Sequence, residues 1–154
     1  MRDWGDVLTD LEHQGIACEP WGVRGDNAVE RIQTTLAVQL TEQLSAFARE
    51  VGNLRIDPFD VCMGGDEHRQ VGAVPATLQL RQRFGAEVPL SALQIMEHAG
   101  EVYLADSVTG AVAAFEALRP VRGEETLCWG SFEGFFEWLV KEAQDFQTGE
   151  ELTF

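Results

Sequence analysis

The sequence predicts a single α+β domain in which an antiparallel β-meander packs against several helices. Apolar residues recur at helical spacing in the first third of the chain and again near its C-terminal end. Between them, short apolar runs alternate with turn-forming residues over positions 93–115. The chain has 154 residues and is 45% hydrophobic, which suits one core without staples or metals. We therefore expect no second domain.

A helix after Trp129-Gly130 is the best-defined element. Its apolar residues are spaced so that they share one side: Phe132, Phe135, Phe136, Leu139, Val140 and Ala143. Ser131 is placed to cap the first turn, and Glu133 puts a negative charge beside the positive end of the helix dipole. Because each large apolar side chain stabilises the fold by roughly 1.5 to 3 kcal/mol when buried, we assign this face to the core.

Three shorter amphipathic helices are expected earlier in the chain. They cover residues 3–13, a segment from Asn27 to Ala37, and a segment from Thr41 to Val51. Asn27 and Glu30 have capping-box spacing, and Thr41 caps the third helix, which Gly52-Asn53 can end. Residues 16–21 fit either an extended segment or a loop.

The β-type runs begin after Gly52-Asn53. They are Leu54–Ile56, Phe59–Cys62, Leu93–Met96, Val102–Ala105 and Ala111–Phe115. Pro58 places the second run on a sheet edge or at a bend. Residues 74–84 fit a helix or a strand, a polar loop leads from Phe115 to the last helix, and residues 146–154 are expected to form a loose acidic tail.

Charge restricts the classes of partner. The 26 acidic and 11 basic residues give a net charge of -15, which repels nucleic acids and anionic membranes and favours a basic protein partner. No stretch of about 18 apolar residues predicts a membrane span, and no export signal is expected. Three widely spaced cysteines predict reduced thiols and a cytoplasmic protein.

Cofactor and catalytic motifs are not indicated. Cys62, Asp66, Glu67 and His68 gather possible ligands within a few residues but without paired metal-ligand spacing. Ser131 does not occupy the central position that a nucleophile elbow requires. We expect no metal, no cofactor and no catalytic residue.

Two motifs resemble a known family. Tyr103-Leu104-Ala105-Asp106-Ser107-Val108-Thr109-Gly110-Ala111-Val112, followed by Trp129-Gly130-Ser131-Phe132-Glu133-Gly134-Phe135 before an apolar helix, resembles the SUKH superfamily of bacterial immunity proteins and cell-wall-assembly regulators. The similarity spans about residues 27–145. The family's Leu-Pro before its second helix is Leu40-Thr41 here, and its usual Asn-Gly after that helix is Gly52-Asn53. The resemblance implies an α+β fold and the binding of a toxin, often a nuclease, made by the same strain.

The first functional hypothesis is an immunity protein that sequesters a cognate basic toxin domain by occlusion. Its candidate contacts are acidic residues and one tryptophan: Asp57, Asp60, Asp66, Glu67, Glu101, Asp106, Glu133, Glu137 and Trp138. A structural use remains open for several of them, because Asp106 can accept the N–H groups of its own turn and Trp138 can pack at the core edge. The alternatives are a regulatory or scaffolding module of the same fold and an enzyme or small-molecule binder.

Overall fold

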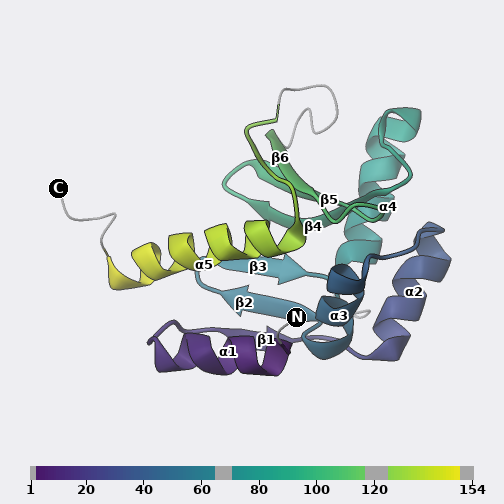
Figure 1. Ribbon diagram of the computed structural model, residues 1–154. Helices are drawn as coiled ribbons and strands as arrows, with labels where there is room; N and C mark the ends of the chain where they lie inside the picture. Colours follow the sequence, from purple (N-terminus) through teal and green to yellow (C-terminus); the bar gives the residue numbers. More distant parts are fainter. Residues whose placement is uncertain (1–2, 65–70, 117–124, 150–154) are drawn as a thin grey trace.

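The computed structural model describes residues 3–64, 71–116 and 125–149 and shows an α+β domain with helices packed on two antiparallel sheets (Figure 1). The helices in this part of the chain are α1 (Trp4–His13), α2 (Asp26–Leu36), α3 (Glu42–Glu50), α4 (Ala73–Phe84), the 3-10 turn η1 (Gly85–Glu87) and α5 (Phe132–Thr148). The strands are β1 (Glu19–Trp21), β2 (Asn53–Ile56), β3 (Phe59–Cys62), β4 (Ala92–His98), β5 (Glu101–Asp106), β6 (Val112–Glu116) and β7 (Leu127–Trp129).

The strands form a three-stranded sheet of order β1-β2-β3 and a four-stranded sheet of order β4-β5-β6-β7. The second sheet confirms the predicted meander and adds β7, in a stretch where the sequence predicted only a polar loop. Val112 pairs with Trp129 and Ala114 pairs with Leu127. β3 is an edge strand of the first sheet, as Pro58 indicated.

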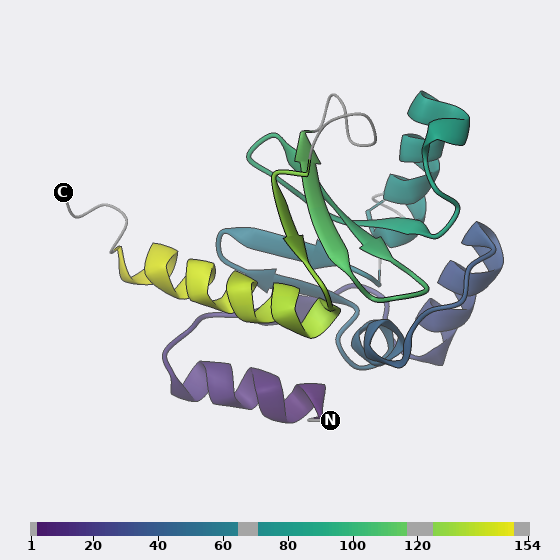
Figure 2. The same ribbon diagram turned by 45° about the horizontal axis from the view of Figure 1, so that its top comes forward.

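The apolar face of α5 forms the centre of the core, as predicted. Phe132, Phe135 and Leu139 are each 0% exposed. The Ser131 hydroxyl accepts the backbone N–H of Gly134 at 3.1 Å, so the predicted cap is confirmed. Figures 1 and 2 show α1 and α5 running side by side next to the three-stranded sheet.

The N-terminal segment also belongs to the buried core. Trp4, Leu11 and Ile16 pack into the main apolar cluster. The open choice for residues 16–21 is settled by β1, which pairs along β2 and tolerates Pro20 because it is an edge strand.

The predicted capping box at the start of α2 is wrong. Gly25 takes the cap position with a φ of 112°, and its residue type offers no side-chain hydrogen bond. Helix α2 then begins at Asp26, whose carboxylate pairs with Arg49 of α3 at 3.0 Å. This ion pair joins the two helices, and Asn27 lies inside the first turn.

The ambiguous segment 74–84 is helix α4, which packs on β4. The buried hydroxyl of Thr77 accepts the backbone N–H of Gln94 at 2.9 Å, next to a register shift in β4. Apolar residues of α4 and of the segment after it, including Leu80 and Val88, form a second cluster against the sheet. Helix α4 therefore covers part of the face of the four-stranded sheet that points away from the main core.

The expected loose tail is partly wrong, because α5 continues through Thr148. The Gln147 side-chain amide donates to the carbonyl oxygens of Ala17 at 3.0 Å and Asp57 at 3.1 Å. These bonds hold the end of α5 against the loop before β1 and the β2–β3 turn. Residues 150–154 lie outside the described residues.

Candidate protein-binding surfaces

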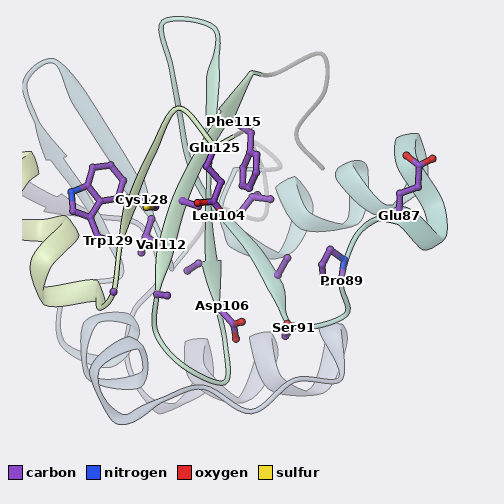
Figure 3. Close-up of a pocket in the computed structure, with 15 residues that line it drawn as sticks. Glu87, Pro89, Ser91, Leu104, Asp106, Val112, Phe115, Glu125, Cys128 and Trp129 are labelled. Atoms are coloured by element: carbon purple, nitrogen blue, oxygen red, sulfur yellow. The ribbon is translucent and has the colours of Figure 1, made fainter. Parts of the chain in front are cut away.

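A hollow of about 480 Å³ lies on the outer face of the four-stranded sheet (Figure 3). Figure 3 shows Phe115 and Glu125 at one end, Asp106 at the other, and Glu87 across the hollow from Trp129. Side chains alternate along β5, so Tyr103 and Ala105 belong to the main core while Leu104 joins the second cluster on the opposite face.

The hollow exists because small side chains occupy the sheet beyond the area that α4 covers. In register, Leu104 of β5 lies opposite Ala113 of β6, and Ala113 lies opposite Cys128 of β7. Ala113 is half-buried and Cys128 is exposed. The face of an antiparallel sheet that is not packed on a core is usually polar. The apolar floor here is therefore a candidate contact surface.

Three carboxylates lie among the described lining residues of the hollow. Glu87, Asp106 and Glu125 are among its lining residues, and none of the described lining residues is basic. An apolar centre with a polar, charged rim is the usual anatomy of a protein interface. The sign of the rim favours a basic partner.

A second concavity, the α1/α3/α5 groove, has a volume of about 270 Å³. It is lined by Trp4, Val7, Gln43, Phe132, Glu133, Phe136 and Glu137. Trp4 brings the three helices together, because its ring makes edge contacts with Phe47 of α3 at 4.9 Å and Phe136 of α5 at 4.8 Å. The backbone N–H of Trp4 also donates to the Glu50 carboxylate at 3.3 Å.

Two exposed carboxylates stand over the aromatic floor of the groove. Glu133 and Glu137 are four residues apart on α5, so their side chains are neighbours. The Gln43 amide nitrogen lies 3.5 Å from Glu133, and neither glutamate pairs with a basic residue in the described part of the chain. Like charges at this spacing destabilise a helix by roughly 0.2–0.5 kcal/mol. A cation bound between them would remove that cost.

The hollow and the α1/α3/α5 groove are neighbours along the chain at the β7–α5 turn. Trp129 and Gly130 line the hollow, whereas Phe132 and Glu133 line the groove. Ser131 separates the two sets of lining residues along the chain.

The candidate residues Asp57 and Asp60, at the three-stranded sheet, form ion pairs and hydrogen bonds within the molecule. Arg55 binds the Asp57 carboxylate at 3.1 Å and the Asp60 carboxylate at 3.1 Å. The Trp21 indole N–H donates to the second Asp60 oxygen at 3.2 Å. Because the single charge of Arg55 compensates one of the two carboxylate charges, Asp57 and Asp60 together add less to an acidic surface than their number suggests. The candidates Asp66 and Glu67 lie outside the described residues.

Asp106 has a structural use in the β5–β6 turn. Its Oδ1 accepts the backbone N–H groups of Val108 at 2.8 Å and Thr109 at 3.2 Å, the Asx arrangement that the sequence left open. Its charge still contributes to the rim of the hollow. Glu101, at the start of β5, accepts the hydroxyl of Thr126.

Trp138 packs into an aromatic cluster and does not project beside Glu133 and Glu137. Its ring lies 4.8 Å from that of Trp129, 6.0 Å from Tyr103 and 5.9 Å from Phe59. The side chain is half-buried. The candidate contacts Glu133, Glu137 and Trp138 therefore do not share one surface, since the glutamates line the α1/α3/α5 groove and Trp138 faces β5 and β7.

Burial and nearby charge perturb two groups in these sheets. Burial, together with the charges of Glu101 and Glu142, raises the pKa of Tyr103 to about 12. Burial, together with the charge of Asp60, raises the pKa of Cys62 to about 12. Both groups are therefore neutral at physiological pH.

Sequence reasoning did not assign Trp4 and Gln43 to a site with Glu133, nor Leu104 and Glu125 to one hollow. These residues are distant in sequence and converge only through helix packing and strand pairing. Along β6 and β7, the positions of small side chains such as Ala113 are visible in the sequence. The positions of small side chains do not show which face of a sheet stays uncovered by a helix.

Over the described ranges 3–64, 71–116 and 125–149, no helix has the length and apolar character needed to cross a membrane. Within the same ranges, no three His, Cys, Asp or Glu residues are grouped so that they could hold a metal ion. Neither the models of known protein families nor the curated protein sequences match this chain.

Proposed function

We propose that this protein is an immunity protein that binds a cognate basic toxin domain and neutralises it by occlusion, without catalysis. The observation that carries the proposal is the hollow on the outer sheet face, with its apolar floor, its three rim carboxylates and no basic side chain among the described lining residues. Such a surface suits a protein with an apolar contact and surrounding basic residues.

Charge and shape have separate roles in this mechanism. The net charge of -15 attracts a cationic partner and accelerates encounter by about 10- to 1,000-fold at low salt. Affinity then depends on side chains that fill the hollow and exclude water. Occlusion requires that the surface of the toxin that fills the hollow include or border its active site.

We propose that the chain is a SUKH-like protein of the bacterial cytoplasm. The α+β architecture and the meander followed by an apolar helix are compatible with the resemblance in the two motifs. Cys18, Cys62 and Cys128 are all free thiols, as suits a reducing compartment.

The test begins with the neighbouring genes. An adjacent gene should encode a large secreted protein that ends in a basic domain, and that purified domain should bind this protein and lose its toxicity. Association should slow steeply as ionic strength rises from 0.01 to 0.15 M, because the Debye length falls from about 30 to 8 Å. Absence of binding and of protection by this protein would refute the proposal.

A substitution in the hollow tests where the partner binds. Ala113→Arg places a bulky cation on the apolar floor and should weaken toxin binding by at least about 100-fold, or roughly 2.7 kcal/mol. Ala17→Arg is the matched control, because Ala17 is exposed and lines neither concavity. Equal binding by the two variants would show that the hollow is not the interface.

A further inference from the structure

The floor of the α1/α3/α5 groove is aromatic. Trp4, Phe132 and Phe136 line it, and Trp4 is in edge contact with both phenylalanines, at 6.0 and 4.8 Å between ring centroids. Trp4 is 9% exposed and Phe136 is 6% exposed, so each presents a small part of its ring to the groove. Phe132 is 0% exposed, so the accessible floor consists of small parts of Trp4 and Phe136, which offer apolar contact to the methylene stem and the guanidinium of a long side chain.

The wall formed by α5 supplies two negative charges. Glu133 and Glu137 are both exposed, and each lacks an ion-pair partner among the described residues. By contrast, the Asp57 and Asp60 carboxylates are already bound by Arg55. In the groove, therefore, aromatic side chains and carboxylates without an ion-pair partner among the described residues line one concavity.

We infer that the α1/α3/α5 groove seats one arginine side chain presented by the protein partner. A guanidinium is planar, weakly hydrated and able to stack on aromatic rings, and its fork of N–H groups can reach two carboxylates together. A lysine ammonium is a more strongly hydrated point charge and stacks less well. The combination of aromatic floor and paired carboxylates therefore favours arginine.

This inference rests on the proposed function for the source of the arginine, but the groove can be tested without a toxin. N-acetyl-arginine-amide is titrated into the isotopically labelled protein at low ionic strength, and the Trp4 indole and the amides of Val7 and Gln43 are followed by NMR. Saturable shifts with about millimolar affinity are expected. N-acetyl-lysine-amide should bind about two- to fivefold more weakly.

Two variants establish the role of the carboxylates. Glu137→Gln keeps the side-chain shape and should weaken the arginine probe about two- to tenfold. Gln43→Lys places a resident cation beside Glu133 and should abolish the saturable shifts. Glu30→Gln is the matched control, because it removes the same charge from an exposed helical position outside the groove and should leave the affinity unchanged.

The outcomes separate the two proposals. Probe shifts that do not saturate at the groove, that persist in Gln43→Lys, or that are equal for arginine and lysine would overturn the inference. Full toxin affinity in both Glu137→Gln and Gln43→Lys would overturn it as well, while leaving the proposed function intact. Probe binding without any toxin binding would overturn the proposed function alone.

Discussion

Tyr103 provides a direct test of the packing between β5, β7 and α5, because it is the only tyrosine of the chain. It is 2% exposed and lies 5.9 Å from Phe135 and 6.0 Å from Trp138, measured between ring centroids. Burial raises its pKa from 10.0 to about 12, and the charges of Glu101 and Glu142 act in the same direction.

The shift has a defined consequence for stability. Two pH units at 1.36 kcal/mol each give an upper limit of about 2.7 kcal/mol, which solvent screening near the hydroxyl lowers to roughly 1–2 kcal/mol. The folded state holds the proton more tightly than the unfolded state. This contribution is therefore fully present below pH 10 and is lost as the pH rises through about 12.

The assay follows tyrosinate absorbance during alkaline titration, with circular dichroism to show that the protein stays folded. The native midpoint should lie near 12 and the denatured midpoint near 10.0. Glu142→Gln should lower the native midpoint but leave it above 10.0, because burial is the larger cause. Tyr103→Phe is the control in denaturant unfolding and should lack this part of the stability loss.

A native midpoint at 10.0, measured while the circular dichroism is unchanged, would refute the reasoning. It would mean that the Tyr103 hydroxyl is solvated and that the aromatic cluster around Trp138 is more open than the structure shows. If the parent protein and Tyr103→Phe lost equal stability between pH 10 and 12, the raised pKa of Tyr103 would not contribute to the free energy of unfolding.

Three further results are expected. Ser131→Ala should lower the free energy of unfolding in urea by about 0.5–2 kcal/mol through loss of the α5 cap, and no change would contradict that role. Asp106→Ala should cost about 1–2 kcal/mol in thermal unfolding, because two turn N–H groups lose their acceptor, and an unchanged melting temperature would disprove it. In thiol labelling, exposed Cys128 should react faster in the folded protein than half-buried Cys62, whose pKa of about 12 disfavours the thiolate; equal rates would contradict that raised pKa.

The elements predicted correctly are those whose signals are local. Ser131 caps α5 because a hydroxyl and the N–H three residues later meet whenever a helix starts there. The Phe face of α5 follows from its spacing alone, and the turns around Gly100 and Gly110 mark the meander. At Asn27 the local signal failed, because Gly25 and the Asp26–Arg49 pair between helices fixed a different start.

The candidate site was only partly predictable. The sequence indicated Glu133, Glu137 and Trp138 of the last helix among the candidate contacts. Helix packing divided them, because α1 and α3 approach the glutamates while β5 and β7 meet Trp138. No pattern within α5 encodes which neighbours approach which side.

The sequence by itself determined the fold class, the apolar face of α5, the Ser131 cap and the acidic net charge on which the proposal of a basic partner rests. These depend on short-range periodicity, capping chemistry and total charge, which are properties of the chain. Only the tertiary structure decided that residues 19–21 and 127–129 are strands and that α4 covers only part of the four-stranded sheet. It also decided that Trp4 and Glu133 line the same groove. These depend on contacts between distant segments, whose free energy arises only when the whole core is assembled.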